Sequence, residues 1–403
     1  MPQTLLFLWG LLAVAQAVPA NYRSATVKRS SKDLLPEYDF IVVGGGTAGL
    51  TVADRLSEDP RKYEWKAWYE RDSIVVQKEH GNGNAYGMIW IPSSYDPDRA
   101  YNRSFGGLGH YQYVQPRQNY HLLPLHSLGL TLKSRDLVLA TSEITLSASA
   151  TRTPIILQLS GVGPKKVIEK AGINLQDHSH SFSLYSSTQD VWPTPTTIHT
   201  NATFPISGGL LLPARSFTSN HLANISLELG LQAIHKHEIL LRSFLSDKSA
   251  IFEHPFQGSP CGTSILLEPF SRGFVNINPK DPFGNPIFDY RLLSNPSDLE
   301  IHVCMQQYIR NHFATSKTLS ALSPVELVPG KYRSSDAEVK KWLVEEGNLN
   351  ASNGHSCGTA SMMPRLLGGV VDSDLNVYGT NHLSIADTGI IPHIIPSSKR
   401  SPK

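Results

Sequence analysis

Cysteine is scarce in this sequence: the 403-residue chain contains three, at positions 261, 304 and 357. Three cysteines cannot form the disulfide framework of a small secreted scaffold, and no Cys/His cluster has the spacing of a metal site. At most one pair can form, and our prediction for it is Cys261–Cys304. Cys357 lies two residues after His355, which would suit a thiol nucleophile, but we favour a small packing residue as its interpretation.

The sequence also lacks an excess of charge of either sign. It has 36 Lys+Arg against 34 Asp+Glu, a net charge of +2, and its basic residues are dispersed along the chain. A nucleic-acid interface needs a clustered basic patch, so we expect no nucleic-acid partner. The hydrophobic content of 40% and the length of 403 residues are sufficient for two domains, or for one large domain with a substantial core.

Long apolar runs are absent after the first 20 residues. Within those residues, an apolar run from Leu5 to Val14 precedes the small-x-small pattern at 15–17, which predicts a secretory signal peptide at residues 1–20. A short membrane anchor is the alternative, although the run is short for a span. We therefore expect a secreted protein without a stable membrane span. Four N-x-S/T sequons fit glycosylation in that route: Asn102, Asn201, Asn224 and Asn350.

What the sequence does contain is a glycine-rich turn within residues 39–56, between an apolar strand and a helix. Gly44, Gly46 and Gly49 have the G-x-G-x-x-G spacing, in which the first glycine allows a tight turn and the second admits a pyrophosphate. The helix then directs its free N–H groups at the phosphates. The pattern predicts dinucleotide binding, with an ordinary βα turn as the alternative. The predicted cofactor-binding residues are Gly44, Gly46, Thr47, Ala48 and Gly49.

The acidic residue that would hold an adenosine ribose is less clear. Glu70 has about the required spacing from the glycines, but the residues before it do not read as a strand. A solvated loop carboxylate is the alternative that we favour. Further along, periodicity and turn residues predict strands near 137–146, 207–212 and 271–278 and helices near 155–159, 295–313 and 334–346.

Four blocks of this sequence together resemble the GMC (glucose–methanol–choline) oxidoreductase family of FAD-dependent alcohol oxidases and dehydrogenases. They occur in family order, and the last is similar to the glucose oxidase-like fungal branch. The resemblance implies an α/β fold (α+β overall), with a Rossmann-like FAD-binding domain and a substrate-binding domain built on an antiparallel sheet. The blocks are residues 39–56, 149–163, 271–282 and 355–379.

The resemblance also implies a division of the chain and a cofactor, FAD. The sequence between about 180 and 260 changes character and is rich in Ser, Thr and His, which we interpret as the start of the substrate-side domain. The expected boundaries are 1–20 for the signal peptide, 21–180 for the first part of the FAD-binding domain, 181–345 for most of the substrate-binding domain, and 346–403 for the C-terminal part of the FAD-binding domain.

For the reaction, the resemblance implies that His355, in His-x-x-Gly-Thr, is the catalytic base. It would take the hydroxyl proton of a primary or secondary alcohol while hydride passes to flavin N5, in a setting such as secondary metabolism. Asp387 matches a family residue near the flavin phosphate and ribityl, and Leu128 falls where the family meets the adenine. We interpret His178 as structural, and His393 lies near the second catalytic position without matching it.

The chain also departs from the family. The Gly-Gly-Ser-Ser-x-x-Asn-Gly block that packs on the isoalloxazine is missing between about 72 and 87, and the second catalytic position falls on Ser398. Residues 399–403 are polar where the family continues in a closing helix. We therefore expect a family member with internal deletions and a different C-terminus. The alternatives to alcohol oxidation are a non-redox enzyme of the same fold, such as a cyclase or dehydratase, and an inactive truncated remnant.

Overall fold

The computed structural model of the chain describes residues 33–57, 139–161, 171–187, 238–246, 249–256, 261–321 and 323–395, with residues 26–27, 87–90, 121–122, 165, 169 and 208–212 as shorter pieces. Among these residues, the helices are all too short or too polar to cross a membrane. Several expectations from the sequence lie outside the described residues: the signal peptide, Glu70, Leu128, Ser398 and the sequons at Asn102, Asn201 and Asn224.

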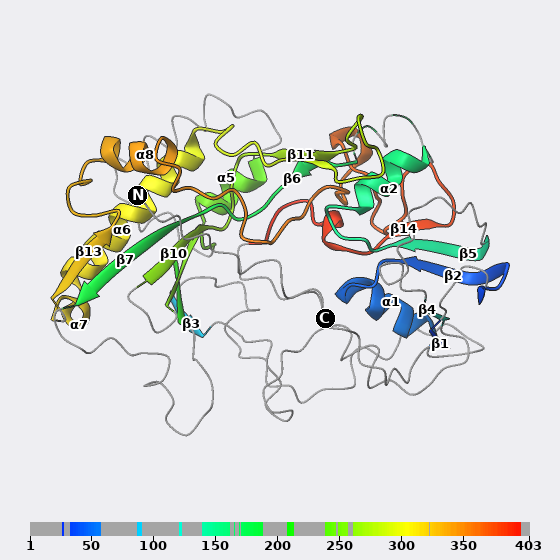
Figure 1. Cartoon of the computed structure of the whole chain (residues 1–403), viewed down its shortest axis with the longest axis horizontal. Helices are drawn as coiled ribbons and strands as arrows, with labels where there is room; N and C mark the ends of the chain where they lie inside the picture. The colour runs from blue at the N-terminus through cyan, green and yellow to red at the C-terminus, as the bar shows by residue number, and fades with distance from the viewer. Residues whose placement is uncertain are drawn as a thin grey trace, which may run out of the picture.

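A three-stranded parallel sheet contains the glycine turn. Its order is β14-β5-β2, formed by Leu383–Ile385, Leu139–Leu146 and Glu37–Val43. Helix α1 (Thr47–Ser57) follows β2 directly, and helix α2 (Thr153–Ser160) follows β5 after a short turn. The strand–turn–helix unit predicted at the glycines is confirmed, and strands from both ends of the chain meet in one sheet (Figure 1).

A larger sheet has six strands in the order β13-β7-β10-β9-β8-β3, and every neighbouring pair is antiparallel. Strand β3 enters it from residues 87–90, so the chain already reaches this sheet before β5 returns to the parallel one. The strands are β3 (Gly87–Trp90), β7 (His180–Ser187), β8 (Gly208–Leu212), β9 (Phe252–Phe256), β10 (Cys261–Leu266) and β13 (Pro324–Val328).

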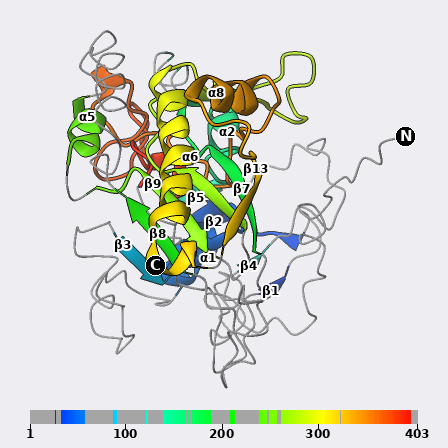
Figure 2. The same cartoon turned by 90° about the vertical axis from the view of Figure 1, so that its left-hand side faces the viewer.

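Helix α6 (Ser297–Thr315) crosses one face of this sheet (Figure 2). Its apolar side chains, including Ile301 and Met305, meet Phe252 and Leu266 of the strands in a buried cluster. Cys304 belongs to the same cluster and is a free thiol, so the predicted Cys261–Cys304 disulfide is wrong. The helix directs the sulfur into the apolar core, where a free cysteine behaves as a small hydrophobic residue.

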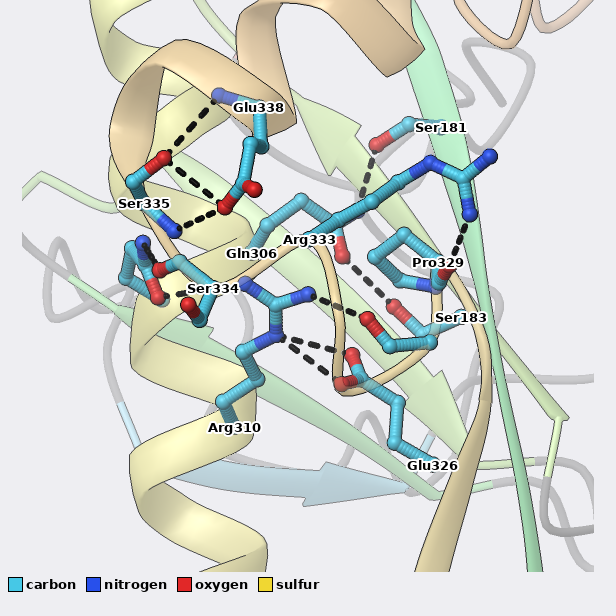
Figure 3. Close-up of polar contacts among 12 residues, drawn as sticks. Ser181, Ser183, Gln306, Arg310, Glu326, Pro329, Arg333, Ser334, Ser335 and Glu338 are labelled. Carbon is cyan, nitrogen blue, oxygen red and sulfur yellow. Dashed lines mark hydrogen bonds and ion pairs between the residues drawn. The ribbon is translucent and has the colours of Figure 1, made fainter.

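Polar side chains also lie between α6 and the sheet. The Gln306 amide donates to Ser181 Oγ at 2.7 Å, and its carbonyl accepts from Ser183 Oγ at 2.9 Å (Figure 3). One turn further along, Arg310 Nε lies 2.9 Å from Glu326 Oε1 and 3.1 Å from Oε2. Because buried polar groups cost free energy unless they are paired, these bonds fix the register of the helix on the strands.

A third sheet, β12-β11-β6, is antiparallel and contains Ile287–Asp289, Gly273–Asn276 and Ile173–Leu175. Strands β6 and β11 run between the parallel sheet and the six-stranded sheet (Figure 1). Helix α8 begins with the predicted polar start, a capping box between Ser335 and Glu338. The remaining elements are β1 (Thr26–Val27), β4 (His121–Leu122), α5 (Glu238–Phe244), α7 (Lys317–Ser320), α8 (Asp336–Val344), η7 (Arg365–Leu367) and η8 (Thr388–Ile390).

Candidate functional site

The turn between β2 and α1 is tight because the protein itself fills two of its glycine positions. Gly44 has φ +134°, and a Cβ there would lie 2.1 Å from the carbonyl oxygen of Ser147. A Cβ at Gly49 would lie 1.9 Å from the carbonyl oxygen of Gly44. Only glycine allows the strand and helix backbones to approach this closely.

The other two glycines of the turn face open space. A Cβ at Gly45 or at Gly46 would meet no atom within 4 Å, and both residues are exposed together with Thr47. The first N–H groups of a helix have no partner inside it, and the positive end of the helix dipole lies there. With Ala48 in the first turn of α1, the arrangement fits an anionic ligand that approaches the backbone at Gly46.

The carboxyl ends of the three parallel strands meet beside this turn. Ser147 N donates to Val43 O at 2.8 Å, and Ala386 N donates to Leu146 O at 2.9 Å. Ser147 Oγ donates to Ala386 O at 2.9 Å. The segments that follow β2, β5 and β14 are therefore bonded to one another, at the edge where open α/β sheets bind ligands.

Asp387 comes directly after this edge and is buried. Its Oδ2 accepts a hydrogen bond from Thr153 Oγ1 at 2.5 Å, and its Oδ1 accepts from Gly389 N at 2.7 Å. Burial raises the pKa of Asp387, while the hydrogen bonds from Thr153, Gly389 and Ser149 oppose that rise. The structure thus places the predicted cofactor residue as a link between the start of α2 and the segment after β14.

His355 lies in a loop whose backbone is held by a second carboxylate, Asp177. Its backbone N donates to Asp177 Oδ1 at 3.0 Å, as does Asn353 N at 3.0 Å. The hydroxyls of Ser352 and Ser356 each donate to Asp177 Oδ2 at 2.8 Å. Asp177 is 4% exposed, so a buried carboxyl group holds residues 352–356 together.

The ring of His355 has a histidine neighbour. The rings of His178 and His355 are 5.2 Å apart between centroids and nearly perpendicular, at 87°. His178 is buried, and its Nδ1 lies 3.2 Å from the carbonyl oxygen of Leu266 on β10. This placement fits the interpretation of His178 as a structural residue, packed beside the ring of His355.

The segment after His355 connects the loop to the edge of the parallel sheet. Thr359 Oγ1 donates to Ala150 O at 2.6 Å, and Ala360 N donates to Gly389 O at 2.8 Å. Thr388 Oγ1 donates to Ser356 O at 3.0 Å. The loop that carries His355 therefore sits on the same edge as Asp387 and the glycine turn, although these segments are far apart in the sequence.

The structure thus brings together His355, Asp387 and the turn residues, and it places Asn350 on the surface beside the His355 loop. Sequence reasoning did not assign a role to Asp177. The block Asn174–His178 shows an acidic residue between apolar and polar ones, but nothing in it marks the carboxylate as buried. Besides His178 N, its hydrogen-bond donors lie 175 to 179 residues further along the chain.

Comparison with known proteins agrees with this arrangement. Residues 269–400 match the family model for GMC oxidoreductases. The dehydrogenase xptC of Emericella nidulans is 30% identical over 380 residues, which cover 78% of this chain and 60% of that protein. An oxygen-dependent choline dehydrogenase of Rhizobium etli is 28% identical over 288 residues, 66% of this chain and 50% of that protein. The chain therefore spans about 60% of the length of the first relative and half of the second.

Solved structures have the same fold. An FAD-dependent oxidoreductase from Chaetomium thermophilum superimposes with a TM-score of 0.66 at 26% identity, over 77% of this chain and 64% of that chain. A fungal aryl-alcohol oxidase superimposes with a TM-score of 0.72 at 21% identity, over 90% of this chain and 96% of that chain.

Proposed function

Because the chain belongs to the GMC oxidoreductase family, we propose that it is an FAD-dependent enzyme that oxidises a primary or secondary alcohol. The observation that carries the proposal is the position of the His355 loop, which is bonded to the carboxyl edge of the parallel sheet beside the glycine turn. The glycine turn beside this edge fits the phosphates of a dinucleotide. The loop bonded to the edge carries His355, a side chain that can accept a proton.

The fit to FAD rests on the open turn. Gly46 leaves room for a pyrophosphate to approach the backbone at the start of α1, while Gly44 and Gly49 are closed by the protein. We assign residues 21–180, apart from β3 at 87–90, and residues 346–403 to a Rossmann-like FAD-binding domain, because β2 and β5 pair in one sheet with β14. Strand β3 belongs instead to the antiparallel sheet. Residues 181–345 supply most of the antiparallel sheet of the substrate-binding domain.

Bound FAD supplies the hydride acceptor of the reaction, the N5 atom of its flavin. The residues of the chain supply position and proton transfer. The His355 imidazole accepts the substrate's hydroxyl proton, because imidazole is the side chain that most often serves as a general base in enzymes. Asp387 links the start of α2 to the segment after β14. Leu128 lies outside the described residues, and its assignment to the adenine rests on the resemblance to the family alone. The substrate is a small-molecule alcohol.

The test is a reductive titration of the purified protein after refolding with FAD. We expect flavin absorbance that bleaches anaerobically with a suitable alcohol, and a product lighter by two hydrogens. The variant His355→Asn should keep its flavin and lose at least about 100-fold in the rate of bleaching, because general base catalysis contributes about 10²–10⁴-fold. His382→Asn is the matched control, since His382 is exposed and its left-handed backbone, with φ 59°, suits asparagine.

Three outcomes would contradict the proposal. Absence of bound flavin after refolding with FAD would exclude the cofactor. Product that has lost water, or has unchanged mass, would favour a non-redox reaction of the same fold. An equal rate in His355→Asn and the control would remove His355 from the proton transfer.

We also propose that the chain is secreted and carries a glycan at Asn350. The support is the signal-peptide pattern at 1–20 and the exposure of Asn350, whose backbone pairs with His180 while its side chain faces solvent. The measurement is the mass of the protein from a secreting host before and after glycosidase treatment. An Asn350→Gln variant should lose one glycan, and secreted protein with an unmodified Asn350 would contradict the assignment.

A further inference from the structure

The carboxyl group of Asp177 accepts an unusually large number of hydrogen bonds. Five donors converge on its carboxylate, and four of them come from the loop that carries His355. From this geometry we infer that Asp177 is the positioning residue of His355. The carboxylate fixes the loop conformation that aims the imidazole at the substrate, without contact with the substrate itself. The inference rests on the proposed role of His355 as proton acceptor.

The two oxygens of Asp177 have different partners. Oδ1 accepts three backbone N–H groups, those of His178 at 2.8 Å and of Asn353 and His355 at 3.0 Å each. Oδ2 accepts the two hydroxyls of Ser352 and Ser356. An ionised carboxylate offers about four lone-pair sites and no donor, so it suits a set of partners that are all donors.

The loop 351–356 lies between two pairs of backbone hydrogen bonds that hold its ends. At one end, His180 and Asn350 exchange backbone hydrogen bonds of 2.9 and 2.8 Å. At the other end, Gln176 and Cys357 exchange two bonds of 3.0 Å. The three residues 177–179 on one side oppose the longer stretch 351–356 on the other, so the loop must bulge. Asp177 occupies the inside of this bulge and replaces the ladder bonds that the loop cannot make.

The bond to His355 N has a direct consequence for the reactive ring. The peptide plane before His355 sets the direction of its Cα–Cβ bond, and that plane is held by a charge-assisted bond to a buried acceptor. A hydroxyl from Ser356 holds the next residue to the same carboxylate, and Tyr290 Oη lies 3.2 Å from that hydroxyl. The orientation of the imidazole is therefore determined by Asp177 and not by contacts of the ring alone.

Two substitutions at Asp177 should differ in how far they displace the His355 loop. In Asp177→Asn the remaining side-chain oxygen accepts the three N–H groups, and the serine hydroxyls rotate to accept from the new NH₂ group. In Asp177→Ala all five donors lose their acceptor, and the loop rearranges. Because a displacement of about 1 Å can cost about 100-fold in rate, we expect kcat to fall about 100-fold in Asp177→Ala and at most about 10-fold in Asp177→Asn.

The readout that distinguishes positioning from a structural role is the split between kcat and KM per bound flavin. We expect KM to stay within about twofold in both variants, because Asp177 does not contact substrate. Asp372→Asn is the matched control: Asp372 Oδ1 also accepts two backbone N–H groups, of Asp374 and Asn376 at 2.9 Å, outside the His355 loop. That control should keep the kcat of the unaltered protein.

Backbone hydrogen exchange supplies a readout that needs no activity. The amides of Asn353 and His355 should lose protection in Asp177→Ala. In Gln176→Leu the loss should instead appear near residue 394, because Gln176 accepts from Ile394 N at 3.0 Å. If the alanine variant does not fold, Asp177→Asn and Ser356→Ala carry the test, each with lower kcat at unchanged KM.

Unchanged kcat in Asp177→Ala with normal flavin content would overturn the inference, as would an equal rise in KM and loss of flavin in all variants. If no alcohol reduces the unaltered protein, the proposed function fails. In that case the exchange experiment alone decides whether Asp177 orders the His355 loop, and protection unchanged in Asp177→Ala overturns that as well.

Discussion

Alanine substitutions in the turn between β2 and α1 should distinguish the glycines required for folding stability from the glycine required for FAD binding. At Gly49 the added Cβ would lie 1.9 Å from Gly44 O, against the 3.0 Å below which real Cβ atoms are essentially never found. Backbone must therefore move by about an ångström, and overpacking of this kind costs about 1–3 kcal/mol. At Gly46 the added Cβ meets no atom within 4 Å.

The expected results differ in kind. Gly49→Ala should lower the free energy of unfolding of the flavin-free protein by about 3 kcal/mol, the upper end of the overpacking range, because both clashing groups are main chain. Gly46→Ala should leave that free energy unchanged or raise it by at most about 1 kcal/mol, because alanine restricts the unfolded chain. It should weaken FAD binding by about 2 kcal/mol, about 30-fold in Kd, through lost hydrogen bonds to phosphate.

The assays are urea unfolding of the flavin-free protein and a fluorescence titration with FAD. Gly45→Ala is the matched control, since the same methyl group enters open space one residue earlier. A Gly46→Ala variant that binds FAD as the unaltered protein does would refute the assignment of the turn as the pyrophosphate site. A Gly49→Ala variant of unchanged stability would refute the reasoning from backbone contact.

Three further predictions concern the packing around the site. Burial lowers the pKa of His302 to about 3 in the folded protein, against about 6.5 in the unfolded chain. The free energy of unfolding is therefore highest above pH 6.5 and falls as the pH drops toward 3, because only the unfolded chain takes up the proton in that range. Between pH 7.5 and pH 5, the free energy of unfolding of His302→Gln should therefore fall by about 2 kcal/mol less than that of the unaltered protein, as measured by urea unfolding. An equal fall in both proteins would contradict this. Removing one partner of the half-buried Arg310–Glu326 pair (Figure 3) by Glu326→Gln should lower the free energy of unfolding by about 1–2 kcal/mol, whereas replacing both by Met and Leu should cost less. Thr153→Val should cost about 2 kcal/mol, because the buried Asp387 loses its hydroxyl donor; Thr141→Val is the exposed control, and equal melting temperatures would argue against the link.

The sequence was informative where structure is set locally. The strand–turn–helix at the glycines and the start of α8 depend on residues within a few positions of one another, and both are confirmed. The antiparallel sheet agrees with the resemblance to the GMC family, but the entry of β3 into that sheet could not be derived from the sequence, because its partner β8 lies more than 100 residues away. The Cys261–Cys304 pair was wrong for a similar reason. The direction in which Cys304 points depends on which side of α6 packs against the sheet, and the sequence alone does not specify that side.

The candidate site shows the same division between local patterns and distant contacts. His355 could be predicted as the base from the sequence, because its motif, His-x-x-Gly-Thr, is contiguous. Asp177 could not, because a buried carboxylate is defined by its donors, and these are brought to it only when β6 and the segment after it pass beside the His355 loop. The same holds for Thr153 and Asp387, which are joined across the edge of the parallel sheet. A contiguous motif can thus be read from the sequence, whereas residues that join distant segments become visible only in the structure. Substitutions at Asp177 and Thr153 therefore test the fold of the site more directly than substitutions at His355, which test its chemistry.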